Sequence, residues 1–274
     1  MNRTGPCTEV LLCDADGNLF PSEEPAFVAS AVITNAFLAA HAVPVRLDPE
    51  QLRLTTTGKN FRTTAVDLAV AYGVPLSPEL AVRHPGAVTG PEGEGLLTAG
   101  ALEHWVLEEK REVTRYLGEV LRPDPAVIGP VTRLLQRYRS AVVSSSASSR
   151  LDACFRASGL APLFPESVRY SAEDSLPVPT SKPDPAVYLF ACERLGVDPA
   201  RAVAVEDSVP GARSAVAAGV PTLGNVAFVP PAERSERVAQ LRAVGVLEVV
   251  SSWTELEHLL ARDDSPLAAC VPAA

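Results

Sequence analysis

The sequence contains no basic tract and no basic region of the kind that marks a nucleic-acid or anionic-membrane surface. Acidic residues outnumber basic ones, 33 to 24, which gives a formal net charge of -9 at pH 7. We therefore expect neither nucleic acid nor a membrane as a partner. An anionic small substrate would need positive charge concentrated at its own site.

The cysteines lack any CxxC or other metal-ligand spacing. There are five of them, an odd number, and reduced thiols in a cytoplasmic protein are the simplest interpretation. The first ten residues, MNRTGPCTEV, lack the apolar core of a signal peptide, and the most apolar stretch, 26–43, is interrupted by polar residues. We expect that stretch to be a buried amphipathic helix and the protein to be cytoplasmic.

A short apolar run that ends in acidic residues organises the rest of the chain. Residues 10–13, VLLC, are typical of a strand buried on both faces, and Asp14, Asp16 and Gly17 follow closely. The strand would deliver two carboxylates to its C-terminal edge, where ligands bind in open parallel sheets. Two adjacent carboxylates favour a cation, and Mg²⁺ suits them because it accepts carboxylate oxygens and keeps positions for water and phosphate. An acidic turn without a metal is the alternative.

Two kinds of pattern divide the chain. Helical signals dominate as far as about 121, with predicted helices at 26–43, from 49, at 63–71 and at 96–121, and a Gly- and Pro-rich loop at 84–95. Beyond Pro123, strand candidates alternate with helical stretches, which predicts a parallel sheet with helices on both faces. The strand candidates are 141–143, 168–170, 202–205, 221–226 and 247–250. The first strand must join this sheet, because the helical region offers it no partner.

The strand candidate at 141–143 runs into Ser144, Ser145 and Ser146, just before a predicted helix. Hydroxyl groups and free backbone amides at such a place can hold phosphate oxygens. Capping of the helix at 151–157 is the alternative, because serine is a common N-cap residue.

The strand candidate at 202–205 ends in a second acid pair, Glu206 and Asp207. Burying these carboxylates unpaired would cost several kcal/mol, and a metal would remove that cost. Helix capping by Asp207 or Ser208 is the alternative.

Lys182 lies between these two strand ends, in the proline-rich segment TSKPDP. Pro183 and Pro185 restrict the local backbone and could hold the ammonium group over a site. A solvated loop lysine is the alternative.

The order of these four features resembles the motif series of the haloacid dehalogenase superfamily. The motifs are DADGN, VVSSS, SKPDP and VAVEDS, and the following PGARSAVAAGV is similar to the phosphatase and β-phosphoglucomutase-like branch. The resemblance covers the whole chain. It implies an α/β fold, with a Rossmann-like parallel sheet core at 1–22 and 123–274 and an inserted all-helical cap domain at 23–122. Asn18 stands where the family usually has threonine, and Ser181 stands where glycine is common.

The resemblance also implies roles for the matching residues. Asp14 would attack the phosphoryl group and form an aspartyl-phosphate, while Asp16 would protonate the leaving oxygen and then activate water. Ser144, with Ser145 beside it, would bind phosphate oxygens. Lys182 would offset the negative charge of the nucleophile and of the phosphoryl group that it binds. An acid at position 16 argues against the branch of the superfamily that attacks carbon, because a phosphate ester needs its leaving oxygen protonated.

Mg²⁺ is the cofactor that the resemblance implies. Asp14, the backbone carbonyl of Asp16 and Asp207 would hold it, with Glu206 reaching it directly or through water. Lys59 and Arg62 belong to a segment, 57–62, that looks like the substrate-facing loop of the cap, and they could reach the leaving group. Exposed charges at the start of a helix are the alternative.

Together these features predict a Mg²⁺-dependent phosphatase that acts on a small phosphorylated metabolite, with a sugar phosphate as the first hypothesis. A sugar phosphomutase is the closest alternative, since it uses the same four motifs. A catalytically silent metabolite-binding protein is a third hypothesis, which the complete set of acids, serine and lysine argues against. The exact substrate and the oligomeric state remain open.

Overall fold

The computed structural model describes residues 8–56, 59–82, 84, 86–90, 95–261 and 267. The chain divides into two compact units. One combines the chain up to Ser22 with the chain from Leu121 onward, and the other is Glu23–Val120. The smaller unit is therefore an insertion between the first strand of the larger unit and the remainder of it.

The larger unit is built on a six-stranded sheet whose paired strands are all parallel. Its order is β3-β2-β1-β4-β5-β6, so the first strand lies inside the sheet, between β2 and β4. The strands are β1 (Val10–Cys13), β2 (Arg139–Ser144), β3 (Arg169–Ser171), β4 (Ala202–Glu206), β5 (Thr222–Asn225) and β6 (Glu248–Val250). The predicted α/β fold with a parallel sheet is confirmed, and each predicted strand is present to within two residues at its ends.

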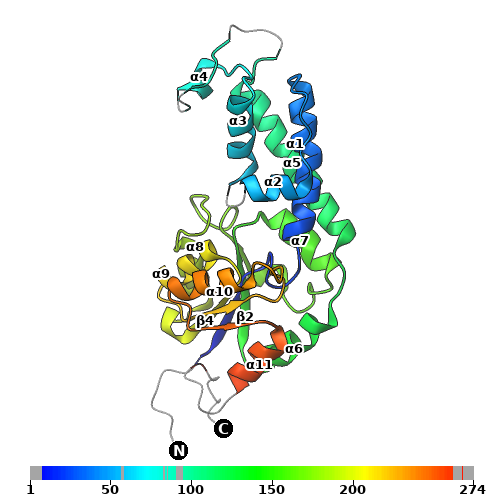
Figure 1. Ribbon diagram of the computed structural model, residues 1–274. Coiled ribbons are helices and arrows are strands. Elements are labelled where there is room, and N and C mark those ends of the chain that lie inside the picture. Colours follow the sequence, from blue (N-terminus) through cyan, green and yellow to red (C-terminus); the bar gives the residue numbers. More distant parts are fainter. Residues whose placement is uncertain are drawn as a thin grey trace, which may run out of the picture. The chain divides into compact units, whose positions relative to one another are not determined.

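Helices cover both faces of this sheet (Figure 1). One face is covered by α8 and α9, whereas α6 and α11 contact each other on the opposite side. The helices are α6 (Pro125–Leu135), α7 (Ser148–Ala157), α8 (Ala186–Leu195), α9 (Val209–Ala217), α10 (Arg234–Ala243) and α11 (Trp253–Ala261), with 3-10 turns η1 (Glu166–Val168) and η2 (Pro199–Arg201).

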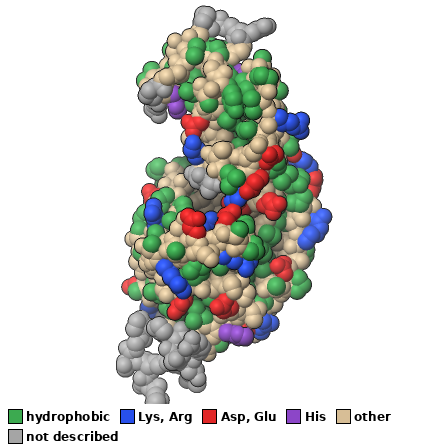
Figure 2. Space-filling view, viewed as in Figure 1, with side chains coloured by type: hydrophobic (Ala, Val, Ile, Leu, Met, Phe, Trp, Pro, Cys, Tyr) green, Lys and Arg blue, Asp and Glu red, His purple; other side chains and the backbone are tan. Residues whose placement is uncertain are grey.

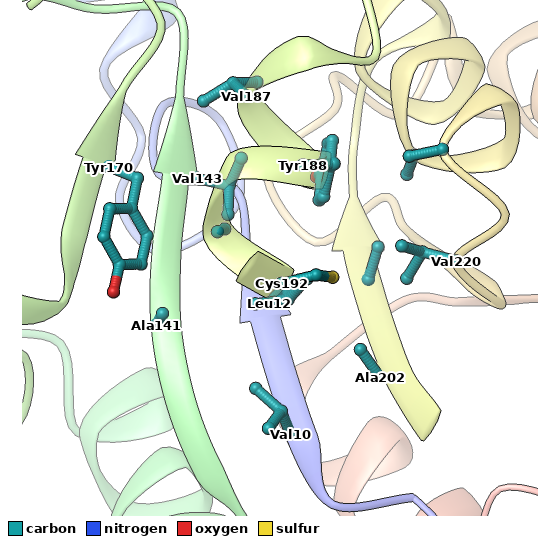
Figure 3. Packing of buried hydrophobic residues seen from close by; sticks show 14 of the residues in the cluster. Val10, Leu12, Ala141, Val143, Tyr170, Val187, Tyr188, Cys192, Ala202 and Val220 are labelled. Atoms are coloured by element: carbon teal, nitrogen blue, oxygen red, sulfur yellow. The ribbon is translucent and has the colours of Figure 1, made fainter. Parts of the chain in front are cut away.

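The central strands form because they are apolar on both faces. Every residue of β1 and β4 is buried. Val10 and Leu12 belong to the cluster beneath α8, which also contains Val143, Tyr188 and Cys192 (Figure 3). Strands covered on both faces need such continuous apolar runs, and here the same runs fix the two strand ends that carry the acids.

The smaller unit consists of helices packed around its own apolar core. Its helices are α1 (Glu23–Ala40), α2 (Pro49–Thr56), α3 (Phe61–Ala71), α4 (Pro78–Ala81) and α5 (Ala99–Val120) (Figure 1). As the acids ahead of the apolar stretch indicate, the first turn of α1 contains Glu23 and Glu24, which suit the positive end of the helix dipole, and the helix ends at Ala40. The last begins three residues later than predicted, because the Thr98 hydroxyl accepts a hydrogen bond from the Ala101 amide at its start.

The predicted loop at 84–95 contains neither helix nor strand where the structure describes it, and positions 85 and 91–94 lie outside the described residues. Leu76 makes isolated bridges to Thr89 and Leu97. These bridges do not extend into a strand in the described part of the smaller unit. The expected all-helical insert is confirmed on this point.

Charged side chains are dispersed over the face of the molecule seen in Figure 2, where Lys and Arg lie among Asp, Glu and apolar side chains. Within the described ranges, no helix is both long enough and apolar enough to cross a membrane.

Candidate active site

The ends of β1 and β4 lie side by side, because the register of the two strands pairs Cys13 with Val205. The next residue on each strand is an acid, Asp14 on the first and Glu206 on the second. The amide of Asp14 donates a hydrogen bond to the carbonyl of Val205 at 3.0 Å and so continues the pairing. Parallel pairing therefore places the two predicted acid pairs at one edge of the sheet.

Three carboxylates converge at this edge. Asp14, Glu206 and Asp207 each offer an oxygen within 4.8 Å of the others, and their residues are 7%, 0% and 5% exposed. The backbone closes tightly on them: a Cβ on Gly17 would lie 2.4 Å from Asp207 Oδ2, and one on Gly211 would lie 1.9 Å from Glu206 Oε2. Gly17 also turns the chain away with a φ of 75°.

The carboxylate oxygens suit a hard divalent cation. Oε2 of Glu206 is buried and has no hydrogen-bond partner among the residues that the structure describes. A buried carboxylate oxygen without a donor is costly unless something positive occupies the space beside it. An all-oxygen donor set with such an atom fits Mg²⁺.

Lys182 is buried at the centre of the acids, with a side chain that is 5% exposed. Its Nζ donates hydrogen bonds to Asp14 Oδ1 at 2.5 Å, to Glu206 Oε1 at 2.6 Å and to the carbonyl of Val143 at 2.8 Å. Burial alone would lower the pKa of Lys182, but Asp14 and Glu206 outweigh it and hold the pKa above its ordinary value. The lysine is a fixed cation, and the alternative of a solvated loop lysine is wrong.

The Asp14 carboxyl has a raised pKa in the absence of a cation. Burial is the main cause, and the charge of Glu206 adds to it, while Lys182 acts in the opposite direction. The pKa of the preceding thiol, Cys13, is also raised, to about 12, by burial first and then by the two neighbouring acids, Asp14 and Glu206. The thiol thus stays protonated and unreactive, and the nucleophilic role of Asp14 remains a prediction.

Asp16 is not one of the three clustered carboxylates and has its own set of donors. Its Oδ1 accepts hydrogen bonds from the Ser22 hydroxyl at 2.6 Å and from Arg150 at 2.9 Å, and its Oδ2 accepts one from the Ser146 hydroxyl at 2.7 Å. Burial pushes the pKa of Asp16 upward, but Arg150 and the hydroxyl donors outweigh it and hold the pKa below its usual value. Sequence reasoning missed both Ser22 and Arg150.

The hydroxyl groups of Ser144 and Ser145 accept hydrogen bonds from backbone amides. Ser144 is buried, and its Oγ accepts a hydrogen bond from the Ser146 amide at 3.0 Å, while Ser145 Oγ accepts one from the Lys182 amide at 3.0 Å. Neither hydroxyl caps the following helix, since α7 has Ala147 at its N-cap and makes no side-chain cap there. Asp174, from the loop after β3, accepts from the Ser148 amide instead. Ser145 therefore ties the serine loop to the lysine loop.

In the second acid motif, one residue caps the following helix and another belongs to the acidic cluster. Ser208 is the N-cap of α9, and its side chain accepts a hydrogen bond from the Gly211 amide. The alternative that capping explains this motif is correct for Ser208, whereas the carboxylate of Asp207 belongs to the acidic cluster. One short sequence therefore both starts a helix and contributes to the site.

Asn18 connects the two strand ends. Its Nδ2 donates to the carbonyls of Asp14 at 2.9 Å and Val205 at 3.0 Å, and its Oδ1 accepts from the Asn225 amide at 2.8 Å. The indole of Trp253 donates to the Asn18 carbonyl at 2.9 Å. Every polar group of the buried Asn18 side chain is satisfied, which explains why asparagine replaces the usual threonine without loss of order.

The predicted cap residues lie in the smaller unit and pair with acids there. Lys59 Nζ lies 2.7 Å from Asp67 Oδ2, and Arg62 pairs with Glu103. All four side chains are substantially exposed, and Asn60 caps α3 between them. Two further residues of the predicted substrate-facing loop, 57 and 58, lie outside the described residues. A role in substrate selection remains a prediction for Lys59 and Arg62.

Comparison with known proteins places this geometry in context. A family model described as haloacid dehalogenase-like hydrolase matches residues 8–219. A CBBY-like protein of Arabidopsis thaliana is 38% identical over 96 residues, which are 35% of this chain and 30% of that protein. A protein of Thermotoga maritima named phosphorylated carbohydrates phosphatase is 29% identical over 161 residues, which are 56% of this chain and 71% of that protein.

A solved structure is similar to this chain over most of its length. A crystal structure of a HAD family hydrolase from Deinococcus radiodurans R1, with bound phosphate and sodium, is 26% identical. The superposition covers 92% of this chain and 94% of the Deinococcus chain, with a TM-score of 0.61. The similarity therefore extends over most of both chains.

Proposed function

The chain belongs to the haloacid dehalogenase-like hydrolases, and we propose that it is a Mg²⁺-dependent phosphatase acting on a small phosphorylated metabolite. One observation carries the proposal: Asp14 is buried against a fixed ammonium group, Lys182, and beside two further acids at the end of a central strand. Phosphoryl transfer needs little beyond a positioned nucleophile and neutralised charge.

In the first half-reaction, the Asp14 carboxylate attacks phosphorus and the bond from phosphorus to the leaving oxygen breaks. Asp16 gives its proton to that oxygen, so the products are an alcohol and an aspartyl-phosphate on Asp14. In the second half-reaction, water attacks the same phosphorus and gives a proton to Asp16. Inorganic phosphate leaves and the Asp14 carboxylate is restored.

The remaining polar groups bind and orient the phosphoryl group. Lys182 offsets the charge of the attacking carboxylate and of the phosphoryl oxygens, and Ser144 donates to one of those oxygens. Ser145, which is bonded to the backbone of Lys182, keeps the two loops in register. These groups are held by strand ends and buried contacts, so little reorganisation is needed when the substrate binds.

The residues that would hold Mg²⁺ are Asp14, Asp207, Glu206 and the backbone carbonyl of Asp16. The unpartnered Oε2 of Glu206 supports this assignment. When bound, Mg²⁺ would neutralise the acids and the phosphoryl oxygens as a Lewis acid.

A sugar phosphate is the substrate class that we propose first. The support is the Thermotoga relative, whose name describes a phosphatase of phosphorylated carbohydrates. The leaving group would then be a sugar hydroxyl, an alcohol poor enough as a leaving group to need the proton that Asp16 supplies.

The test is phosphate release from a panel of phosphorylated metabolites, with Mg²⁺ and with a chelator. We expect release that needs Mg²⁺ and that is absent in Asp14→Asn. Asp152→Asn is the matched control, because Asp152 pairs with Arg169 in the same unit and outside the acidic cluster. Isomerisation of a sugar phosphate without net phosphate release would instead indicate a phosphomutase. Release that Asp14→Asn retains would remove Asp14 as the nucleophile.

A further inference from the structure

Tyr188, on helix α8, contacts Glu206 of the second acid pair. Tyr188 lies in the first turn of α8 and is fully buried, with its ring in the apolar cluster that also holds Val143 and Val187 (Figure 3). Its hydroxyl donates a hydrogen bond to Glu206 Oε1. Nothing in the sequence pattern singled out this residue, because an aromatic side chain near the start of a helix is most often a packing residue.

The two oxygens of Glu206 have unequal surroundings. Oε1 accepts hydrogen bonds from the Tyr188 hydroxyl and, at 2.6 Å, from Lys182 Nζ. Oε2 accepts none from the described residues, and it lies where a Cβ on Gly211 would be 1.9 Å away. The carboxylate is therefore held through Oε1, while Oε2 lies close to Gly211 without a donor among the described residues. Glu206 also forms the acidic cluster with Asp14 and Asp207.

We propose that Tyr188 is a positioning residue for the cation site: its hydroxyl fixes the orientation of the Glu206 carboxylate within the acidic cluster, and so the place that this candidate ligand offers to a cation. The inference rests on the proposed Mg²⁺ dependence and adds to it a residue that does not touch the cation. Hydrogen-bond partners of this kind orient ligands, and losing one typically costs 10- to 100-fold in metal affinity.

The phenol is suited to this task because it remains a donor. Burial, followed by the charges of Glu206 and Asp14, raises the pKa of Tyr188 well above its ordinary value. The Lys182 ammonium group, which also donates to Oε1, lies 5.3 Å from the centre of the Tyr188 ring, so the ring contacts this ammonium group as well. Phenylalanine at this position would keep the ring, its packing and this contact, and would remove only the hydroxyl.

Tyr188→Phe therefore isolates the hydrogen bond, and Tyr138→Phe is the matched control. Tyr138 is also buried in the larger unit, and its hydroxyl donates to the carbonyl of Leu260 at 3.2 Å, on α11. Both variants lose a buried phenolic hydroxyl that donates to an oxygen acceptor. Only the first loses it at the acidic cluster.

The experiment is calorimetric titration of the metal-free full-length protein with Mg²⁺, accompanied by thermal melting to confirm folding. We expect Mg²⁺ binding to be about tenfold weaker in Tyr188→Phe and unchanged in Tyr138→Phe. Phosphate release at saturating Mg²⁺ should return to within about twofold of the wild type in Tyr188→Phe, because the chemistry is intact once the cation is bound.

Equal Mg²⁺ affinity in Tyr188→Phe and wild type would overturn the inference and leave the proposed phosphatase intact. An equal loss of affinity in both tyrosine variants would also overturn it, because the effect would then be general destabilisation. Wild-type protein that binds Mg²⁺ in a Tyr188-dependent way but releases no phosphate would uphold the positioning role and contradict the proposed function. Absence of Mg²⁺ binding by the wild type would overturn both.

Discussion

The guanidinium of Arg150 lies 2.9 Å from Oδ1 of Asp16, although the two residues are 134 positions apart in the chain. Both side chains are about three-quarters buried, at 25% and 24% exposure. The proposed acid and base of the reaction is thus held in its ionised form by a cation from α7. This pair should set the pH range over which Asp16 can give a proton to the leaving group.

Replacing Arg150 by methionine should raise the pKa of Asp16, because the strongest influence that lowers it is removed. Asp16 must be protonated to act in the first half-reaction, so a higher pKa extends that half-reaction to higher pH. We expect kcat/KM for an alkyl phosphate to hold its value to higher pH in Arg150→Met than in the wild type. An aryl phosphate should show little change, because its leaving group needs no proton.

Arg133→Met is the control for this measurement, since Arg133 pairs with Glu257 in the same unit but at an exposed position. Superimposable pH profiles for Arg150→Met and the wild type on the alkyl phosphate would contradict the role given to the pair.

The metal-free protein should lose stability as the pH rises from about 4 toward 8. Burial, with Glu206, raises the pKa of Asp14 from 3.8 to about 8 in the folded protein. Between these values the folded state binds a proton that the unfolded state has released, so the free energy of unfolding falls with increasing pH. Thermal melting in chelator should show this slope, and Asp14→Asn should lack it.

Mg²⁺ should oppose the same loss, because it binds the ionised cluster of the folded state only. The gain in melting temperature on adding Mg²⁺ should therefore be larger at pH 8.5 than at pH 5.5. A gain that is independent of pH would mean that Asp14 does not titrate in this range.

Asn18→Ala should destabilise the protein by about 1–3 kcal/mol, because it removes the donor to two buried carbonyls and leaves the Asn225 amide without its acceptor. Urea denaturation would measure the change. Because Asn18 joins the ends of β1 and β4, we also expect phosphatase activity to fall in protein that remains folded. A variant as stable as the wild type would show that water replaces all three hydrogen bonds.

Lys59→Ala and Arg62→Ala should hardly change stability, since exposed ion pairs contribute about 0–1 kcal/mol. They should instead change the order of preference among phosphorylated metabolites more than the hydrolysis of a small aryl phosphate. Arg111→Ala removes a similar exposed pair, with Glu108, from the same unit and is the control. Equal losses on every substrate would place Lys59 and Arg62 outside substrate selection.

The sheet and the acidic cluster were accessible from the sequence for one physical reason. An apolar run that ends in acids, repeated at 10–14 and 202–207, predicts two buried strands, and parallel pairing brings their carboxyl ends together. The same logic located Ser144. Lys182 was suspected only from its order among the motifs, because a loop lysine gives no sign of burial on its own.

The partners that hold the acids were not accessible in this way. Arg150 and Tyr188 lie in the first turns of helices, where arginine and tyrosine have no distinctive pattern, and their contacts depend on how α7 and α8 pack. Ser22 ends the loop that follows the first motif, and its bond to Asp16 depends on the turn at Gly17. Contacts that tertiary packing creates between ordinary side chains leave no periodicity to detect.

The two glycines that face the second acid pair carry a consequence for how this protein can diverge. Neither has a side chain to offer chemistry, yet a methyl group at position 211 would lie 1.9 Å from Glu206 Oε2, and one at position 17 would lie 2.4 Å from Asp207 Oδ2. Selection on the acids is therefore also selection against a side chain at either position. A lineage that abandoned phosphate chemistry would be released at Gly211 together with Glu206, whereas Gly17 would still be restricted by its positive φ. A side chain at position 211 would therefore be an early trace of lost activity.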